Sequence, residues 1–542
     1  MFLAKPAKPT RDPLWTAGWV SVWLASLGNG ALWLHLAKLP DISGARGGVL
    51  LLVMGAVLAS GLFFMQSVFA GRLASKLLAC ALLLATAPAA YFMFSYGIVI
   101  DVTMLKNTLQ TDFKESKELI SVGLIMCVLL LGVLPCAWVI SRQHTAVRWS
   151  QRLVRNAVCA VLALLLAILG TYAVKGDVAT LMRNHTKVRY MMTPFNIVYG
   201  GIRLVQGEAK ALPFVSLGQA SVADELPAAM PVMVLVVGET ARSDHFSLNG
   251  YARNTNPALA QHGVLSFNNV WSCGTNTADS VPCMFSHLGR EQFFKRAANY
   301  DNLLDVLQTA GYSVLWLENN SGCKGVCARV STETSSKAQH PTHCTAEGCF
   351  DEILSVDLAK RVQTLRSAQP ASRGVVVLLH QLGSHGPAYF KRSPQDSKPF
   401  KPECATNVLQ SCDIPSIINA YDNSIAYTDR FLAGIIDQLK TLPASYAPSM
   451  VYMSDHGESL GEKGTYLHGL PYAISPDAQK HIPLIMWFST ALQSQRGLRA
   501  GCMKDQISTE LSHDYLFHSV LSLLNVRSAS YKPELDWFKP CL

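Results

Sequence analysis

Three apolar runs in the C-terminal half of the chain are each followed by side chains that can bind a metal ion. The runs and their followers are Val232–Val237 with Glu239, Val375–Leu379 with His380 and His385, and Ser449–Met453 with Asp455 and His456. A single carboxylate after a strand is often a helix cap or a turn residue. Three such ends together predict a metal site. Mixed carboxylate and imidazole ligands suit zinc or manganese better than calcium.

His468 follows His456 by twelve residues, in the sequence Tyr466-Leu-His-Gly469. It could be a further metal ligand or a group that binds phosphate. It could equally be an ordinary loop histidine, and the residue pattern leaves these alternatives open.

A candidate nucleophile lies in segment 272–283, where hydroxyl side chains crowd a predicted strand-to-helix turn. A hydroxyl at a helix N-terminus lies at the positive end of the helix dipole, where an anionic phosphate is stabilised. A bound metal could lower its pKa and make it an attacking alkoxide. At least one hydroxyl here must be an ordinary N-cap. Chemistry alone does not choose among Thr275, Thr277 and Ser280.

The elements that must position these residues alternate between strand and helix. Helical stretches over Asp301–Ala310 and Asp422–Lys440 separate the continuous apolar runs. This pattern predicts an α/β domain with a parallel sheet covered on both faces. Ligands of such sheets bind beyond the carboxyl ends of the strands. We therefore expect the residues that follow the three runs to meet at one edge.

The N-terminal third has a different character, with five apolar stretches that are each about 20 residues long, enough to cross a bilayer. They are Leu14–Ala37, Gly48–Ala70, Ser75–Tyr96, Leu119–Ile140 and Leu153–Val174. The first is too long, and too closely followed by others, for a cleaved signal peptide. Five in succession favour a membrane domain over buried core helices.

Lysines and arginines in the short loops set the orientation of these spans. They concentrate before the first span, between the second and third, and between the fourth and fifth. This distribution puts the N-terminus in the cytoplasm and everything after residue 175 on the outer side. We expect a transmembrane domain over 1–175, a bridging segment over 176–225 and a catalytic domain over 226–542. The bridging segment could be an interfacial helix or a packed linker.

Cysteine usage gives an independent indication of the compartment. Ten cysteines follow the spans, an even number that favours disulfides in an oxidising compartment. The simplest pairing is local: Cys273–Cys283, Cys323–Cys327, Cys344–Cys349, Cys404–Cys412 and Cys502–Cys541. Cys80, Cys127, Cys136 and Cys159 lie in the spans, where we expect small apolar fillers. A zinc ribbon is disfavoured because two CxxC units are lacking.

The composition gives no indication of a nucleic-acid partner, and we expect none. The 542 residues are 50% hydrophobic and 15% charged, and much of the net charge of +9 lies near the spans. It therefore reports topology, and no basic stretch interleaved with aromatic residues suggests nucleic-acid binding. We expect a monomer.

Three motifs carry a resemblance to a known family. They are Val237-Gly-Glu-Thr-Ala-Arg-Ser-Asp-His-Phe-Ser-Leu-Asn-Gly-Tyr251, Ser272-Cys-Gly-Thr-Asn-Thr-Ala and Ser454-Asp-His-Gly-Glu-Ser-Leu-Gly-Glu462. The chain resembles the lipid A phosphoethanolamine transferases, which include the EptA and mobile colistin-resistance enzymes. The resemblance covers the whole chain. Five potential disulfides favour the EptA branch.

The resemblance implies an alkaline-phosphatase or sulfatase-like α/β domain in the periplasm of an inner-membrane protein. It selects Thr277 as nucleophile and implies that Glu239, Thr277, Asp455 and His456 hold Zn²⁺. Other matching positions are His385 and His468 for a second metal or the phosphoryl group, Ser321 and Lys324 in the substrate pocket, and Asn107 and Glu115 in lipid-substrate binding. Cys323 and Cys327 flank Lys324, where the mobile branch lacks cysteine, and we expect a different local loop that keeps Lys324.

The implied reaction transfers phosphoethanolamine from phosphatidylethanolamine to a lipid A phosphate through a covalent threonine intermediate. The added ammonium groups would protect against cationic peptides such as polymyxins. One alternative is the same transfer to Kdo, a core sugar or another glycan. Another is a membrane-anchored phosphatase or sulfatase-like hydrolase, although a threonine nucleophile argues against a sulfatase. A non-enzymatic sensor is disfavoured because every zinc ligand is kept.

Overall fold

The structure, a computed structural model, describes residues 10–111, 113–145, 147–208, 212–222, 228–335 and 338–542. The chain forms two compact units. Unit 1 contains the described residues up to Lys106 and from Ile120 to residue 208, and unit 2 contains Asn107–Leu119 and the residues from 212 onward. Unit 1 thus includes much of the expected bridging segment. The domain limits near residues 175 and 225 stay predictions.

Unit 1 contains the five predicted membrane spans. They run over Pro13–Ala37, Gly44–Val68, Ala74–Tyr96, Val122–Ser141 and Trp149–Ala173. The first span comprises α1 (Pro13–Ser26) and α2 (Gly30–Ala37). The second, third and fifth spans are the single helices α3, α4 and α9. The fourth span joins α7 (Val122–Cys127) to α8 (Leu134–Ser141) through a π-helical turn. Each has 20–25 residues and is apolar, which is the length that a bilayer requires.

Helices after the fifth span also pack within unit 1. They are α10 (Lys175–Asn184) and α11 (Phe195–Glu208). The segment between them is fixed by Asn29, whose side chain donates to the Thr193 carbonyl and accepts from the Thr193 amide at 2.9 Å. The segment around Thr193 is therefore packed within the membrane unit.

One expectation for the membrane cysteines is wrong. Cys80 on α4 and Cys136 on α8 face each other and form a disulfide, whereas Cys127 and Cys159 are free. The two helices pack side by side, so residues far apart in sequence meet. Outside the spans, the ten other cysteines form the five local pairs proposed from their spacing.

Unit 2 is built on an eight-stranded sheet with the order β15-β4-β14-β11-β3-β10-β6-β7. The strands are β3 (Met230–Gly238), β4 (Leu265–Trp271), β6 (Ser313–Glu318), β7 (Ser331–Thr334), β10 (Val375–His380), β11 (Tyr446–Ser454), β14 (His481–Phe488) and β15 (Leu511–Ser512). The three apolar runs are β3, β10 and β11, which are parallel neighbours at the centre. Their side chains are almost entirely buried because both sheet faces are covered.

The sheet differs from a purely parallel one at β14, which pairs antiparallel with β11 and β4. Between β11 and β14 the chain forms only the short hairpin of β12 (Ser459–Leu460) and β13 (Tyr466–Leu467), with two single turns. A parallel partner would need a crossover connection, usually a helix. Because this connection has no crossover helix, β14 starts at the edge where β11 ends and runs antiparallel to it.

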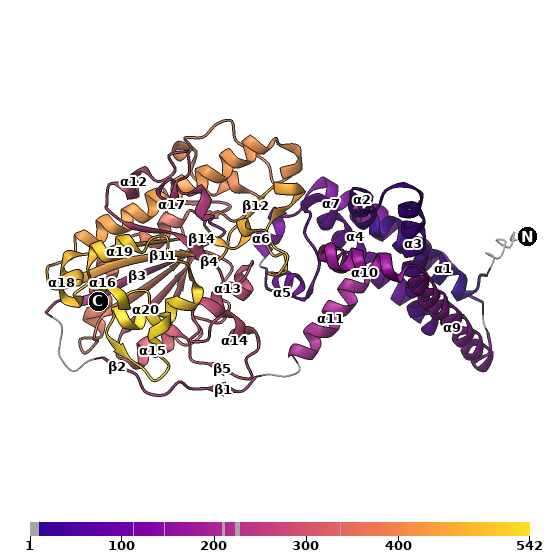
Figure 1. The fold of residues 1–542 in the computed structure, drawn as a ribbon, viewed down its shortest axis with the longest axis horizontal. Coiled ribbons are helices and arrows are strands. Elements are labelled where there is room, and N and C mark those ends of the chain that lie inside the picture. The colour runs from indigo at the N-terminus through magenta and orange to yellow at the C-terminus, as the bar shows by residue number, and fades with distance from the viewer. Residues whose placement is uncertain (1–9, 112, 146, 209–211, 223–227, 336–337) are drawn as a thin grey trace, which may run out of the picture. The chain divides into compact units, whose positions relative to one another are not determined.

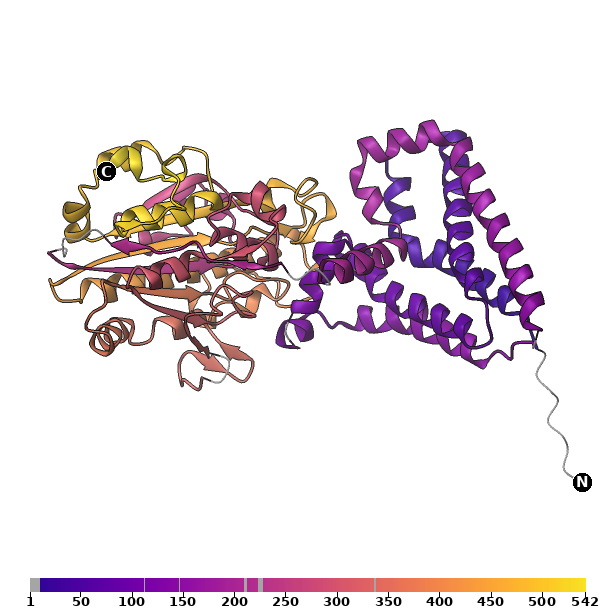
Figure 2. The same ribbon diagram turned by 90° about the horizontal axis from the view of Figure 1, so that it is seen from below.

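Helices cover both faces of this sheet (Figures 1 and 2). The larger ones are α13 (Thr277–Met284), α15 (Leu303–Thr309), α16 (Leu358–Ala368), α17 (Ile414–Lys440), α18 (Thr490–Arg496) and α20 (Leu516–Leu523). The two predicted helices correspond to α15 and the second part of α17. Helix α15 begins at a capping box formed by Asn302 and Asp305.

Smaller elements complete unit 2. They are α6 (Phe113–Glu118), α12 (Pro257–Ala260), α14 (Arg290–Phe294), α19 (Ala500–Asp505), and the strand pairs β1 (Phe214–Val215) with β5 (Asn299–Tyr300), β2 (Ser221–Val222) with β16 (Val526–Arg527), and β8 (Cys344–Thr345) with β9 (Gly348–Cys349). Helix α5 (Val102–Gln110) begins in unit 1, and its last residues belong to unit 2.

Candidate active site

Adjacent strands bring the predicted metal ligands together. Strands β3 and β11 are in register with Gly238 opposite Ser454, so Glu239 and Asp455 both lie one residue past the sheet edge. Ligand atoms of Glu239, Asp455 and His456 all lie within 4.8 Å of one another. All three side chains are fully buried.

Strand β10 supplies the loop that closes against Glu239. Gly383 in this loop has φ +53°, and a Cβ there would lie 2.7 Å from the Glu239 carbonyl oxygen, so the close approach requires glycine. The Ser384 amide donates to the same carbonyl at 3.0 Å. His385 follows in this loop, whereas His380 is taken up by a buried ion pair with Glu318 at 3.0 Å.

Of the three hydroxyls that the sequence left open, that of Thr277 contacts two of the predicted metal ligands. Thr277 is the first residue of α13, and its Oγ1 donates to Glu239 Oε2 at 3.1 Å and lies 3.5 Å from His456 Nε2. Thr275 instead donates to the Leu470 carbonyl at 2.6 Å, and Ser280 accepts from the Gly274 amide at 2.8 Å. Their hydroxyls are therefore structural.

Asn276 explains why α13 begins where it does. Its side chain accepts from the Asp279 amide at 3.1 Å and is the N-cap of the helix. Thr277 thus lies at the positive end of the helix dipole. The Cys273–Cys283 disulfide joins the preceding turn to the same helix.

His468 lies beside His456, and His385 lies beside His468. The His456 and His468 rings are 4.4 Å apart between centroids, and the His468 and His385 rings are 5.3 Å apart. His468 Nδ1 lies 3.2 Å from an oxygen of the buried Glu458. Burial raises the pKa of Glu458 to about 7.

Electrostatics at the centre call for a cation. Burial, followed by the charge of the neighbouring Asp455, raises the pKa of Glu239. Burial also raises the pKa of Asp455 and lowers that of His456. Asp455 Oδ2 accepts no hydrogen bond from the described residues. Two desolvated carboxylates and a neutral imidazole with converging atoms fit a divalent metal ion of the zinc type.

The predicted substrate-pocket residues lie in the loop after β6. Lys324 Nζ donates to the hydroxyl and to the carbonyl of Ser321, at 3.0 and 3.1 Å. No hydrogen bond or ion pair joins Asn107, on α5, to the metal ligands among the described residues. Glu115 belongs to α6, but its side chain lies outside the described residues.

Two residues were missed by the sequence reasoning. Asn320 donates to Glu239 Oε2 at 2.6 Å and to the Gln381 carbonyl at 2.8 Å. It follows the end of β6 and could have been found by extending the strand-end rule to that strand. Glu458 contacts the ring of His468. It could have been found from the third motif, where a second carboxylate follows Asp455 after three residues.

Comparison with known proteins identifies the family. A phosphoethanolamine transferase EptA/EptB family profile matches residues 58–209, and a sulfatase profile matches residues 231–526. Phosphoethanolamine transferase EptA of Salmonella typhimurium is 38% identical over 476 residues, which cover 86% of each chain. The chain belongs to the phosphoethanolamine transferase family. Phosphatidylethanolamine transferase Mcr-1 of Escherichia coli is also 38% identical, over 83% of this chain and 84% of its own.

Solved structures agree over both units. The integral membrane lipooligosaccharide phosphoethanolamine transferase A of Neisseria meningitidis is 33% identical, with a TM-score of 0.93, and the match covers 98% of this chain and 99% of that one. The soluble domain of that enzyme matches with 39% identity and a TM-score of 0.57, over 61% of this chain.

These matches and the five spans define the location of this phosphoethanolamine transferase. It is a multi-pass protein of the bacterial inner membrane, and its sulfatase-like domain is periplasmic. This agrees with the lysine and arginine distribution and with the five disulfides outside the spans.

Proposed function

We propose that this transferase moves phosphoethanolamine from phosphatidylethanolamine to a phosphate of lipid A, and that this protects the cell from polymyxins. The observation that carries the proposal is the hydrogen bond between Thr277 Oγ1 and Glu239 within a cluster of metal-binding side chains. The names of the EptA and Mcr-1 relatives support the transferred group.

Glu239, Thr277, Asp455 and His456 would hold Zn²⁺. The ion would stabilise the Thr277 alkoxide and the charge on the phosphoryl oxygens. His385 and His468 would contact the phosphoryl group or a second metal ion. Lys324 would add positive charge on the same side, oriented by its hydrogen bonds to Ser321.

The first half-reaction forms a covalent intermediate. Thr277 Oγ1 attacks the phosphorus of phosphatidylethanolamine, the bond to the glycerol oxygen breaks, and diacylglycerol leaves after taking up a proton. The hydroxyl proton of Thr277 has an acceptor in place, because Oγ1 already donates to Glu239. In the second half-reaction a lipid A phosphate oxygen attacks the same phosphorus, the bond from phosphorus to Thr277 Oγ1 breaks, and Oγ1 takes up a proton to restore the hydroxyl.

The membrane unit serves both half-reactions because donor and acceptor are lipids of the same membrane. Tethering the catalytic unit at that surface raises the effective concentration of each. Asn107 and Glu115, in the segment between the third and fourth spans, would contact the donor lipid. We expect the enzyme to act as a monomer.

Two substitutions test the proposal. Thr277→Ala removes the nucleophile, and Glu239→Ala removes its hydrogen-bond partner and a metal ligand. Both variants should lose polymyxin protection while remaining expressed in the membrane. In the unaltered enzyme a phosphoethanolamine adduct should be trapped on Thr277, and both variants should lack it. Full protection in either variant would overturn the site assignment.

The acceptor is tested separately, because a Kdo sugar or another glycan would use the same chemistry. Mass spectrometry of lipopolysaccharide from cells with and without the gene should show one phosphoethanolamine mass on lipid A. If that mass were found on a core sugar instead, the acceptor would be the core sugar, and the proposed transfer reaction would still hold. Rapid release of free phosphoethanolamine without an acceptor would identify a hydrolase.

A further inference from the structure

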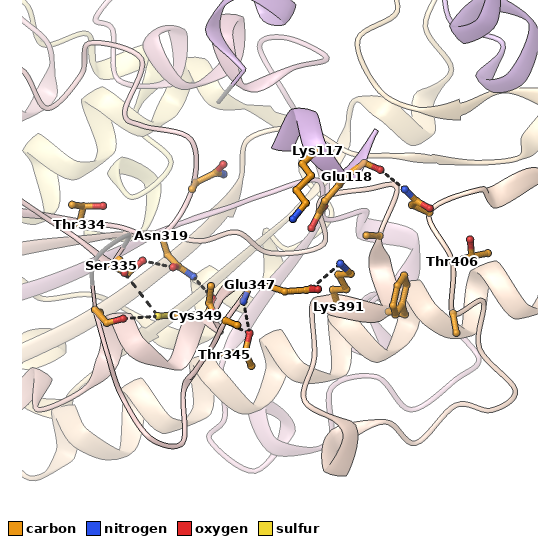
Figure 3. A pocket seen from close by; sticks show the side chains of 18 residues that line it. Lys117, Glu118, Asn319, Thr334, Ser335, Thr345, Glu347, Cys349, Lys391 and Thr406 are labelled. Carbon is orange, nitrogen blue, oxygen red and sulfur yellow. Dashed lines mark hydrogen bonds and ion pairs between the residues drawn. The ribbon is translucent and has the colours of Figure 1, made fainter. Parts of the chain in front are cut away.

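A polar cavity of about 860 Å³ lies in unit 2 beside the candidate active site (Figure 3). Asn320 belongs to both: it lines the cavity, and its side-chain amide donates to Glu239 Oε2 at 2.6 Å. A molecule bound in the cavity would therefore lie next to the residues that carry the transfer.

Two disulfides and a buried ion pair hold segments that line the cavity. One wall includes the β8–β9 hairpin, which the Cys344–Cys349 disulfide closes, and another includes Ala405–Asn407 within the Cys404–Cys412 loop. Helix α6 reaches the cavity through Glu118, whose carboxylate is held by the buried Arg392 guanidinium. Preorganised walls reduce the entropy lost on binding.

The charges around the cavity leave one cation unmatched. Its two carboxylates are paired, Glu118 with Arg392 and Glu347 with Lys391 at 2.7 Å. Lys117 has no hydrogen bond or ion pair in the described part of the chain, and Figure 3 shows it extending from α6 into the cavity. The cavity is thus suited to an anionic group.

The remaining lining is suited to a sugar. Seven of the 18 described lining residues carry a hydroxyl or amide side chain, among them Ser335, Thr345 and Thr406. Phe390 adds one aromatic face, and the other apolar residues among the described lining are small. Hydroxyl and amide groups match the hydrogen-bonding groups of a carbohydrate. Acyl chains would find little aliphatic surface here.

We propose that this cavity binds the phosphorylated sugar head of the acceptor glycolipid, with Lys117 facing its phosphate and Phe390 facing a sugar ring. The proposal rests on the proposed function and extends it, because it separates an acceptor site from the donor site. The transferred group would pass from Thr277 to an acceptor oxygen beside Asn320.

The test measures the two half-reactions separately with full-length enzyme in phosphatidylethanolamine vesicles. Diacylglycerol release without acceptor reports the donor step, and phosphoethanolamine transfer to added lipid A reports the acceptor step. Lys117→Ala and Phe390→Ala should each raise the KM for lipid A about tenfold, the effect of one lost charged or aromatic contact. Their diacylglycerol release should stay unchanged, which also shows that the variants are folded.

Matched controls are available outside the cavity. Lys504 is an exposed lysine without an ion pair among the described residues, and Phe294 is a half-exposed phenylalanine. Lys504→Ala and Phe294→Ala should change neither half-reaction. An unchanged KM for lipid A in both cavity variants would overturn the proposal, as would a loss confined to diacylglycerol release, which would assign the cavity to the donor.

A second measurement uses the unaltered enzyme and so does not depend on the folding of a variant. Glucosamine 6-phosphate should compete with lipid A in transfer without slowing diacylglycerol release, and inorganic phosphate alone should compete more weakly. No competition by the sugar phosphate would contradict the proposal. If the unaltered enzyme released no diacylglycerol at all, the proposed function would fail instead.

Discussion

At the scale of single residues, buried carboxylates outside the active site couple the stability of unit 2 to pH. Asp429 on α17 accepts hydrogen bonds from the Ala258 and Leu259 amides, at 2.8 and 2.9 Å, and so fixes the start of α12. Burial raises its pKa to about 6, from an ordinary value near 3.8. The folded state therefore binds this proton more tightly than the unfolded chain does.

Asp429→Asn should reveal this coupling. Stability from the bound proton is fully present below pH 3.8 and is lost as the pH rises through about 6. Asparagine does not titrate, so the effect of its altered hydrogen bonds on the free energy of unfolding does not change with pH. The free energy of unfolding of the unaltered protein, relative to the variant, should fall by about 2 kcal/mol between pH 4 and pH 7. Denaturant unfolding of both proteins across that range measures it, and a constant difference would contradict the assignment.

At the scale of elements, the start of α13 positions Thr277, the proposed nucleophile. Asn276→Ala removes the cap that accepts from the Asp279 amide and should cost about 1 kcal/mol of stability. The first turn should fray, so that Thr277 is less often held against Glu239. We expect kcat for transfer to fall with little change in KM, as measured by initial rates.

A matched variant distinguishes the general loss of stability on removing an N-cap from the specific effect on the placement of Thr277. Ser489 is the N-cap of α18 and accepts from the Leu492 amide at 3.2 Å, away from the site. Ser489→Ala should cost similar stability and leave kcat unchanged. An equal fall in kcat for both variants would mean that α13 has no special role in placing Thr277.

The α6 segment depends on a buried ion pair within unit 2. Arg392 binds Glu118 and also donates to the His385 carbonyl at 2.6 Å, so it links α6 to the active-site loop. Glu118→Ala leaves the guanidinium buried and unpaired, at a cost of about 3 kcal/mol. Hydrogen exchange should quicken in residues 116–120 and 385–392.

The control for Glu118 is an exposed pair. Glu291 pairs with Lys295 at 2.7 Å, and both side chains are exposed. Glu291→Ala should leave the free energy of unfolding almost unchanged, because exposed ion pairs contribute little to stability. Exchange that stays slow in residues 116–120 of Glu118→Ala would show that other contacts hold α6.

Local patterns explain which elements were predictable. The apolar runs of β3, β10 and β11 identified the sheet centre because a doubly covered strand is apolar throughout. Parallel packing then placed Glu239 and Asp455 at one edge. The antiparallel direction of β14 was missed, because a strand run does not show the direction in which the chain returns.

Long-range pairing limited the rest of the prediction. The choice of Thr277 over Thr275 and Ser280 depends on which hydroxyl faces Glu239, and no sequence spacing encodes that contact. The Cys80–Cys136 pair needs two helices to pack face to face. The link from Glu118 to Arg392 joins residues 274 positions apart, so the loop between spans gave no sign that it belongs to unit 2.

At the scale of the whole molecule, the periplasmic unit buries two carboxylates, Glu239 and Asp455, at the edge of its central sheet. Glu239 and Asp455 are both fully buried, and their mutual repulsion opposes folding unless a cation is bound. A ligand that binds only the folded state stabilises it by mass action, about 4 kcal/mol at a thousandfold excess over Kd. The stability of the entire unit should therefore depend on metal.

Metal removal tests this dependence without using activity. Chelation of the detergent-solubilised protein should lower the midpoint of thermal unfolding of unit 2, and added Zn²⁺ should restore it. Glu239→Gln removes one of the repelling charges, so without metal this variant should unfold at a higher temperature than the unaltered protein. With Zn²⁺ its midpoint should rise far less, because a ligand is lost. Equal zinc-dependent rises in both proteins would show that Glu239 does not hold the ion and would transfer that role to the neighbouring carboxylates.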